Sequence, residues 1–540
     1  MSYFDKPRFH KPVHPARQKP PPADPLLEPC TPHRLPLLCA SRVPTDDAPP
    51  LLLHAQAGIE MQQAAKSDEG ERKRQQGAQR AMLADAKHAL RHVLPYLGVR
   101  CAATQCSTLA RHPAVQAHVF RSRRSKHICP DPAGNEALRV LQLGVDQEAA
   151  LSDEARAAIA ACGGEILEHP VVLDWDYWSV DQILRAILPV ELAQGAPSAF
   201  SMVGHIAHVN LREEYLAYRY LIGELILEKT PRVETVVNKL DTIDTEFRVF
   251  AMELLAGEPR YEAQVSESNC LFTLDFRHVY WNSRLHTEHA RLIQQFQPFQ
   301  VVADVMAGVG PFAVPAAKKG VWVLANDLNP ACFASMQHNV TQNKVEGHCH
   351  TFNEDGHEFI RASAVRAWDA AFSAHDNSLL SERQKRKERR RLREEGVPEP
   401  APATMEPPHR LIDHFVMNLP ATALEFLDAF RGLYVRLAAH IGHEALLTEL
   451  DARRNVPGLE PWPMVHVHCF TKDVERAGAD ICQRASAALG LDDEHCLQPP
   501  GSPHATPDLS LHLVRSVAPN KDMYCLSFRL PESVLFDKRV

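Results

Sequence analysis

The fold of this chain is decided by one stretch, Val301-Val302-Ala303-Asp304-Val305-Met306-Ala307-Gly308-Val309-Gly310-Pro311-Phe312. It predicts an apolar strand that enters an Ala-Gly-x-Gly turn, after which the chain continues as a helix. Glycine at 308 and 310 lets the backbone come within contact distance of a ligand, because a Cβ at either position would collide with it. The stretch therefore predicts the first strand and the ligand turn of an α/β domain.

Two acidic residues and a proline narrow the choice of ligand. Asp304 lies four residues before Gly308, and Asp327 ends the next apolar run, Val321 to Ala325. An acidic side chain about 20 residues beyond a glycine turn is positioned to bind ribose hydroxyls. Pro311 disfavours a pyrophosphate, because proline lacks the N–H that a phosphate would need there. We therefore expect a nucleoside ligand without phosphates, and S-adenosylmethionine fits that description.

The composition limits the classes of protein. At 540 residues the chain exceeds one ordinary domain. Its formal net charge of −8 means that any contact with nucleic acid must come from local basic patches. Thirteen scattered cysteines with no CxxC pair argue against a zinc ribbon or a disulfide framework, and they favour a reducing compartment. The chain has neither a long apolar run nor a hydrophobic signal core, so we expect no transmembrane helix and no secretion.

The pattern along the chain divides it into four parts. Residues 1–50 are rich in proline and predict a disordered tail; a mitochondrial presequence is the alternative, which the prolines disfavour. Residues 51–169 and 170–275 mix helical and strand-like segments and predict two small α/β modules. From 276 to 540, strands and helices alternate as in a doubly wound sheet.

Within the last part we expect one sheet and one insertion. The strands are predicted at 301–305, 321–326, 414–419 and 464–470, with a closing hairpin at 511–517 and 523–530. Residues 364–410 hold a basic run from Arg383 to Arg393 and then a proline-rich stretch. We interpret them as a solvated loop insertion, with RNA affinity or a nuclear-import signal as the alternative.

Polar residues after predicted strands extend the candidate site. Asn418-Leu419-Pro420-Ala421 follows an apolar run, and ligands of open α/β sheets lie beyond the carboxyl ends of the strands. The Asn418 amide can hold the edge of a nucleobase while Pro420 stiffens the loop; an ordinary turn is the alternative. Asp355-Gly356 lies where an adenine-binding acid would fall, and a helix N-cap is an equal alternative.

The segment from Val279 to Arg291 is dense in functional side chains. Glu288 could act as a general base if burial raised its pKa toward the working pH. The alternative is a glutamate that only favours the dipole of a helix that begins near Glu288 with Thr287 as its cap. His289, judged by its position alone, is more often a structural residue than a ligand contact.

Several motifs in one order resemble a known family. They are Tyr280-Trp281-Asn282-Ser283-Arg284-Leu285, the turn at 304–312, Asn326-Asp327-Leu328-Asn329-Pro330 and Met417-Asn418-Leu419-Pro420, with Arg248 and 252–258 before them and 517–521 after. Over about 170–540 the chain resembles the class I tRNA (guanine-37-N1)-methyltransferases of eukaryotes and archaea. The resemblance implies an α/β fold: a class I Rossmann-like S-adenosylmethionine-dependent methyltransferase domain preceded by smaller α/β tRNA-binding modules.

The resemblance also implies a reaction and roles for residues. The methyl group of S-adenosylmethionine would go to N1 of guanosine 37, next to the anticodon, which supports maintenance of the reading frame. Arg248 would hold the guanine O6, Glu288 would take the N1 proton, and Asn418 and Pro420 would position the base. The donor site would comprise His289, Asp304, Gly308, Gly310, Asp327, Leu328, Asp355, Gly356 and Asn418. The chemistry is consistent, because guanine N1 is a poor nucleophile until its proton is drawn off.

We expect tRNA as the partner, no metal, no membrane association and a monomer. We expect the protein in the cytoplasm, with pools in the mitochondrial matrix and the nucleus. Binding of tRNA should weaken with salt if several phosphates are contacted. The candidate phosphate contacts are Lys229, Arg232, Lys239, Arg248, Arg515, Lys521 and the basic cluster near Lys385.

Three other functions are alternatives, and the last of them, a nicotinamide-dependent oxidoreductase, is disfavoured by Pro311. A methyltransferase acting on an exocyclic amine of RNA, DNA or protein commonly carries Asn-Pro-Pro-aromatic after its fourth strand. Here Leu419 and Ala421 provide no aromatic ring to stack on a flipped base. A non-catalytic RNA-binding protein on a decayed enzyme fold should have lost the donor turn first, whereas Asp304, Gly308 and Gly310 are all present.

Overall fold

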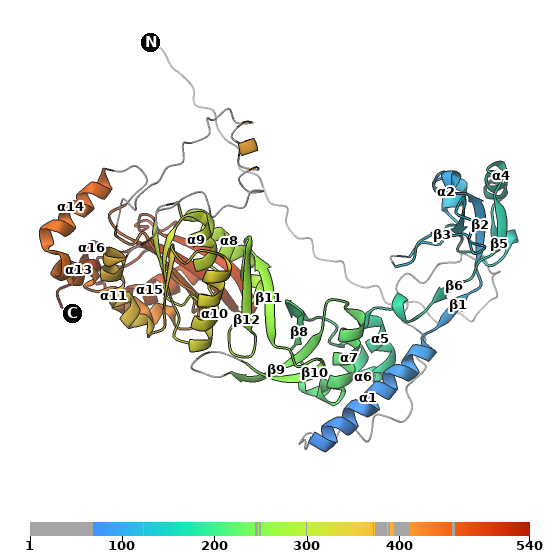
Figure 1. Ribbon diagram of the computed structural model, residues 1–540, viewed down its shortest axis with the longest axis horizontal. Helices are drawn as coiled ribbons and strands as arrows, with labels where there is room; N and C mark the ends of the chain where they lie inside the picture. Colours follow the sequence, from blue (N-terminus) through green and yellow to red (C-terminus); the bar gives the residue numbers. More distant parts are fainter. Residues whose placement is uncertain are drawn as a thin grey trace, which may run out of the picture. The chain divides into compact units, whose positions relative to one another are not determined.

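The computed structural model describes residues 69–539 apart from 123, 244–246, 248–249, 299, 456–459 and most of 371–409. The expected N-terminal tail, Arg248 and nearly all of the charged insertion lie outside the described residues. Contacts divide the described chain into two compact units. One contains Pro95–Pro170, and the other contains residues 69–94 together with the chain from Val171 onward (Figure 1).

The first unit is a small antiparallel sheet with helices. Its strand order is β3-β4-β2-β5, and helices α2 and α4 pack on it. The core contains Val99 and Leu141 from the central strands and Ile159 from α4. The elements are β2 (Leu97–Ala102), α2 (Ala103–Leu109), α3 (Pro113–Gln116), β3 (Ile128–Pro130), β4 (Leu138–Gln142), α4 (Asp153–Ala161) and β5 (Glu165–Glu168).

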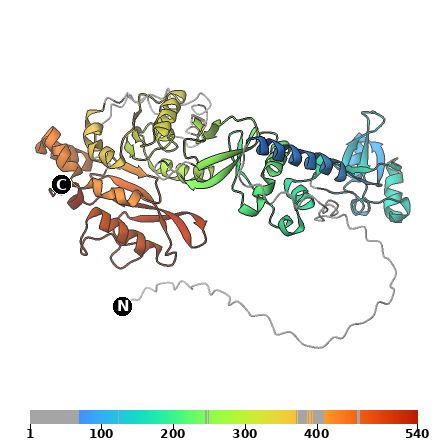
Figure 2. The same ribbon diagram turned by 90° about the horizontal axis from the view of Figure 1, so that it is seen from below.

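The second unit begins with helix α1 (Glu69–Ala89), which lies along helix α7 (Arg219–Lys229) (Figures 1 and 2). The Gln79 side chain donates to the Ala217 carbonyl at 2.7 Å and accepts from the Leu221 N–H at 2.7 Å. Helix α1 therefore belongs with the part of the chain that α7 organises, and not with the residues that directly follow it.

The part around α7 contains a four-stranded sheet and short helices. The strand order is β10-β9-β8-β7, and only the β8–β9 pair is parallel. The elements are β1 (His92–Leu94) paired with β6 (Val171–Leu173), α5 (Val180–Ile187), α6 (Val190–Ala193), β7 (Ser201–Val203), β8 (Ile206–Val209), β9 (Thr235–Ile243) and β10 (Phe250–Gly257).

The rest of the second unit is built on a seven-stranded sheet in the order β15-β14-β13-β16-β17-β19-β18. The first five strands are parallel, whereas β19 runs antiparallel to both of its neighbours. The strands are β13 (Val301–Asp304), β14 (Trp322–Asn326), β15 (Cys349–Phe352), β16 (His414–Met417), β17 (Met464–Thr471), β18 (Ser510–Ala518) and β19 (Lys521–Arg529). This confirms the α/β fold and the predicted strands; β15 is an additional strand.

Apolar layers cover both faces of this sheet. On β13, Val301 and Ala303 join one core while Val302 joins the other, because successive side chains of a strand point to opposite faces. Strands that are buried on both faces are apolar throughout. Their continuous apolar runs can therefore be recognised in the sequence. The hairpin of β11 (Glu262–Glu267) and β12 (Cys270–Asp275) contributes to the core that contains Val302.

Most helices of this part lie in the connections between strands of the sheet, whereas α8 precedes β13 and α16 follows β19 (Figure 1). Helix α11 continues through Asp369, so the expected insertion begins after this helix and not at residue 364. Within the described ranges, no helix combines the length and the apolar character that crossing a membrane requires. The helices are α8 (His286–Gln295), α9 (Ala313–Lys319), α10 (Pro330–Gln342), α11 (Gly356–Asp369), α13 (Leu433–Ile441), α14 (His443–Arg454), α15 (Ala477–Leu489) and α16 (Glu532–Leu535).

Candidate active site

The carboxyl ends of four parallel strands meet at one edge of the sheet. The register pairs Asp304 of β13 with Ala325 of β14, and Asn326 of β14 with Phe352 of β15. Strand β16 continues the row on the other side of β13. The residues predicted from strand ends, Asp304, Asp327, Asp355 and Asn418, therefore all come from loops or strand ends on this edge.

The glycine turn after β13 is tied to the end of β14. The Gly308 N–H donates to Asp327 Oδ2 at 2.8 Å. Gly308 and Gly310 both have positive φ, +58° and +93°. A Cβ on Gly308 would project into open space, whereas a Cβ on Gly310 would lie 2.9 Å from Val314 Cγ2. Gly308 thus borders space that a ligand can use, and Gly310 is required by its φ and by its packing against Val314.

Asp304 is an orphaned buried carboxylate. It is fully buried, and neither carboxylate oxygen has a hydrogen-bond partner among the described residues. Burial, reinforced by the charge of nearby Asp327, raises the pKa of Asp304 well above its ordinary value. The side chain is therefore poised to gain from a cationic or hydrogen-bonding ligand group.

Two adjacent residues after β14, the acidic Asp327 and the apolar Leu328, offer different side chains to a ligand. Asp327 Oδ1 accepts from the Asn329 N–H at 2.9 Å, and burial raises the pKa of Asp327. Leu328 is 47% exposed, which is unusual for a leucine at the end of a buried strand. The Asn353 amide donates to the carbonyls of Asp327 and Leu328 and fixes their backbone.

Asp355 and Gly356 have local structural roles. Asp355 caps helix α11, its Oδ1 accepting from the His357 N–H at 2.8 Å, which confirms the N-cap alternative. A Cβ on Gly356 would lie 2.9 Å from the Phe426 ring, so packing accounts for this glycine. The Asp355 side chain is still half exposed.

The loop after β16 is tied to the neighbouring strand and carries an unpaired amide oxygen. Asn418 Oδ1 is buried and has no hydrogen-bond partner within the described part of the chain. The Pro420 carbonyl accepts from the Phe470 N–H at 2.9 Å, which ties this loop to the end of β17. This amide oxygen is therefore free to accept a hydrogen bond from a ligand.

Glu288 lies in the first turn of α8 and is 3% exposed. Its carboxylate accepts two hydrogen bonds of 2.7 Å from Arg291 and contacts His468 Nε2 at 2.8 Å. Burial would raise the pKa of Glu288, but these partners outweigh it and lower the pKa to about 2. The prediction that burial brings this pKa up toward the working pH is therefore wrong for this arrangement.

His289, next to it, is held by structural contacts. It is buried, its Nδ1 lies 2.5 Å from Glu267 Oε1, and its ring meets Phe312 edge-on at 4.7 Å between centroids. Because Phe312 ends the glycine turn, the ring contact of His289 with Phe312 packs His289 against that turn. Arg248, predicted to hold the guanine, lies outside the described residues.

Three buried polar residues, Asn326, His466 and His468, received no role from the sequence. Asn326 bridges the loops after β13 and β15, donating to the carbonyls of Val305 and Glu354. His466 and His468 are buried on the same face of β17. The signal was present, because both histidines interrupt an otherwise apolar run at a spacing of two.

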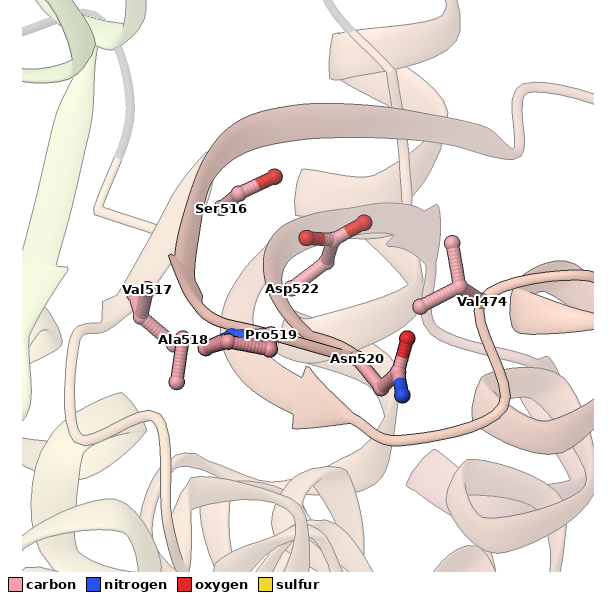
Figure 3. A pocket seen from close by; sticks show the side chains of 7 residues that line it. All are labelled: Val474, Ser516, Val517, Ala518, Pro519, Asn520 and Asp522. Atoms are coloured by element: carbon pink, nitrogen blue, oxygen red, sulfur yellow. The ribbon is translucent and has the colours of Figure 1, made fainter.

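The expected phosphate contacts differ in their surroundings. Lys229 donates to the Trp175 carbonyl at 2.6 Å, and burial lowers the pKa of Lys239 to about 8, so both are partly committed to the fold. Lys521 lies 4.3 Å over the Phe470 ring, close to the Pro420 loop. Beside it, the tip of the β18–β19 hairpin borders a pocket of about 470 Å³, whose lining includes Val474, Pro519 and Asn520 (Figure 3).

The order of the sheet, the glycine turn after its first strand and the acid after its second together define a Rossmann-like α/β methyltransferase. Residues 263–369 match the TRM5/TYW2 methyltransferase domain, and residues 180–260 match the TYW2 N-terminal domain. Both matches lie in the second unit.

Comparison with known proteins narrows the class to one family. The tRNA (guanine(37)-N(1))-methyltransferase of Coprinopsis cinerea is 47% identical over 84% of this chain and 95% of its own length. That of Schizosaccharomyces pombe is 45% identical over 77% of this chain and 87% of its own length. The solved structure of aTrm5 with tRNALeu has a TM-score of 0.52 at 19% identity, covering 81% of this chain and 100% of that one. The chain belongs to the tRNA (guanine(37)-N(1))-methyltransferase family.

Proposed function

We propose that this chain methylates N1 of guanosine 37 in tRNA and that S-adenosylmethionine binds at the carboxyl edge of the seven-stranded sheet. The main support for a donor site there is a set of buried polar atoms on that edge that lack hydrogen-bond partners among the described residues. Asp304 and Asn418 each keep buried polar atoms without hydrogen bonds among the described residues, and Gly308 faces open space. Buried polar atoms are costly unless paired, so such groups at one edge favour a polar ligand.

The donor-site residues divide by the part of the ligand that each suits. Asp327 would accept hydrogen bonds from the ribose hydroxyls, and exposed Leu328 would pack against the adenine ring. Asp355, half exposed at its helix cap, would accept a hydrogen bond from the adenine amine. Asp304 offers a carboxylate to the cationic part of the donor. Gly310, Gly356 and His289 would act indirectly, by shaping the turn and its support.

The transfer itself requires that guanine N1 lose its proton. When bound, S-adenosylmethionine supplies a sulfonium methyl group to an attacking lone pair. Glu288 would accept the N1 proton, Arg248 would stabilise the negative charge that develops at O6, and Asn418 and Pro420 would position the base. Proximity of the base and the donor would provide much of the remaining acceleration.

The ion pairs of Glu288 constrain this role. A carboxylate that accepts two hydrogen bonds from Arg291 and one from His468 is strongly stabilised as the anion. Arg291 is one-quarter exposed whereas His468 is fully buried, so Arg291 is the partner that incoming tRNA can displace. We therefore propose that the substrate loosens the Arg291 pair before the proton is transferred.

The test separates chemistry from donor binding. Glu288→Gln should lower the single-turnover rate of methyl transfer by roughly 10²-fold or more, the usual contribution of a general base, and should change the affinity for S-adenosylmethionine little. Glu444→Gln, an exposed glutamate in the first turn of α14, is the matched control and should behave like the wild type. Equal losses of rate and donor affinity in Glu288→Gln would make Glu288 a binding residue and would remove it as the base.

A further inference from the structure

Three neighbouring strands place a row of side chains opposite Glu288. In the register of the sheet, His468 of β17 faces Cys525 of β19, and Cys525 faces His512 of β18. Directly opposed residues on neighbouring strands share one face of a sheet. The row therefore lies along the face that helix α8 covers with Glu288 and Arg291, as the contacts of Glu288 with both histidines show.

The two histidines of this row differ in their access to water. The His468 side chain is 0% exposed and lies 2.8 Å from Glu288 Oε1. The His512 side chain is 47% exposed and its Nε2 lies 3.6 Å from Glu288 Oε2. A movement of a few tenths of an ångström would bring His512 within hydrogen-bond distance of the carboxylate. One imidazole thus closes the buried side of Glu288, and the other connects it to solvent.

We propose that His512 relays the guanine N1 proton from Glu288 to water, while His468 holds the Glu288 carboxylate in place. The inference rests on the proposed function, because it takes Glu288 as the group that accepts the N1 proton. His512 acts through Glu288 and is therefore a positioning and relay residue, distinct from the groups that touch the base.

The proton balance of the relay is complete. The N1 proton moves to Glu288, the N1 lone pair forms a bond to the methyl carbon, and the carbon–sulfur bond breaks with its electrons left on sulfur. The proton then passes from Glu288 Oε2 to His512 Nε2, and the imidazolium releases a proton to water. The net products are the N1-methylated base, the neutral thioether and one proton.

The other groups around Glu288 are unsuited to this step. The Arg291 guanidinium has no acceptor and does not deprotonate in proteins. Burial opposes the charged form of His468, but the Cys525 sulfur and Glu288 raise its pKa to about 10, so it already carries a proton. Burial and the charge of Arg291 lower the pKa of His512, which leaves its ring neutral and able to accept a proton at physiological pH.

The relay also explains how a strongly paired carboxylate can serve as a base. The hydrogen bonds from Arg291 and His468 stabilise the Glu288 anion, so a proton that remained on Glu288 would be unfavourable. Passing the proton to an exposed imidazole restores the anion and makes the abstraction favourable overall. Loss of His512 should therefore slow the transfer itself and leave donor binding unchanged.

The experiment compares single-turnover methyl transfer from S-adenosylmethionine to a tRNA transcript with guanosine 37, from pH 5 to 9. His512→Gln should be slowed roughly tenfold at pH 7, less than the full 10²-fold or more of a lost base, since water can replace the imidazole in part. The wild-type rate should fall at acidic pH, at a pH below the ordinary imidazole value of about 6.5 because the pKa of His512 is lowered, and this fall should be absent from the variant. In His512→Ala, added imidazole should restore the rate in proportion to its concentration.

Two further variants make the outcome decisive. His495→Gln, an exposed histidine paired with Asp492 away from Glu288, should keep the wild-type rate and pH profile. If Glu288→Gln is inactive while His512→Gln keeps the wild-type rate and acid limb, the relay is overturned and the base assignment survives. If Glu288→Gln itself keeps the wild-type rate, the base assignment fails and the relay fails with it. A slow His512→Ala that imidazole does not restore would also overturn the relay.

Discussion

At the scale of single residues, burial has opposite consequences for two carboxylates of the same site. Asp304 is buried without partners among the described residues, and its pKa is raised well above the ordinary value. Glu288 is nearly as buried, but three hydrogen bonds from Arg291 and His468 lower its pKa to about 2. Burial alone does not determine the charge of a carboxylate; its hydrogen-bond donors do.

This contrast predicts the effect of pH on stability through Asp304. Its pKa is higher in the folded protein than the unfolded value of 3.8. Between the unfolded and the folded pKa, the folded state therefore binds more protons than the unfolded state does. The free energy of unfolding should therefore fall as the pH rises from about 4 to the folded pKa, by about 1.4 kcal/mol for each pH unit between the unfolded and folded pKa values. Asp304→Asn should remove this decline.

The measurement is denaturant unfolding of the protein without added donor at several pH values between 4 and 8. The Glu288 pair contributes in the opposite sense, and its stability is lost only as the pH falls below about 4.5 toward 2. The two contributions therefore occupy different pH windows. Identical pH dependence in Asp304→Asn and the wild type would contradict the account of Asp304.

At the scale of elements, the turn between β13 and α9 separates a ligand role from a packing role. Gly308 borders open space, and Gly310 is packed against Val314.

A buried ion pair holds the C-terminal end of helix α14. Arg453 is 1% exposed, pairs with Asp413 and donates to the Leu411 carbonyl, and Asp413 in turn accepts from the Val301 N–H at the start of β13.

We predict that alanine at the two glycines has different effects. Gly308→Ala should cost about 1–2 kcal/mol of stability through its positive φ, and it should weaken donor binding roughly tenfold by filling the space beside the turn. Gly310→Ala should cost more stability, because its Cβ would also press on Val314 at 2.9 Å. Calorimetric titration with S-adenosylmethionine measures the donor affinity, and denaturant unfolding measures the stability. Unchanged donor affinity in Gly308→Ala would place the donor elsewhere.

The ion pair at the end of α14 gives a second prediction at this scale. Arg453→Ala should cost about 3–5 kcal/mol of unfolding free energy, because it leaves the Asp413 carboxylate buried without its charged partner. The neighbouring pair of Arg454 with Asp451 is exposed on both sides, so Arg454→Ala should change stability by less than about 1 kcal/mol. Similar losses in the two variants would show that burial of the Arg453 pair has no special effect.

At the scale of the whole molecule, a chain with a net charge of −8 must bind a polyanion. Local basic side chains therefore have to supply the contacts, and Lys521 of the β18–β19 hairpin lies near the Pro420 loop, because both contact Phe470. Counterion release makes such contacts sensitive to salt, whereas a donor in a shielded crevice is not.

We therefore predict that affinity for tRNA and affinity for the donor respond differently to salt. Between about 50 and 200 mM salt, tRNA affinity should fall about 10³-fold if roughly six phosphates are contacted. The affinity for S-adenosylmethionine should stay nearly constant over the same range. Filter binding and calorimetric titration measure the two, and a tRNA affinity that is insensitive to salt would contradict binding through phosphate contacts.

The parts predicted from the sequence are those whose signal is local. The buried strands β13, β14, β16 and β17 read as apolar runs, and the glycine turn reads as a turn. The row of His468, Cys525 and His512 depends on a register between strands, which no local pattern encodes. The same holds for α1, whose Gln79 bonds to residues 138 and 142 positions away in the sequence. The pairing of Glu288 with His468 likewise joins residues 180 positions apart, which is why a local pattern predicts the wrong direction for the Glu288 pKa.

The most direct test of the central claim is methyl transfer from labelled S-adenosylmethionine to unmodified tRNA transcripts that carry guanosine or adenosine at position 37. The modified nucleoside is then identified by chromatography and mass spectrometry. We predict N1-methylguanosine from the guanosine transcript and no methylated product at position 37 of the adenosine transcript. Donor binding without methylation of either transcript, or a methyl group on an exocyclic amine, would contradict the proposed reaction.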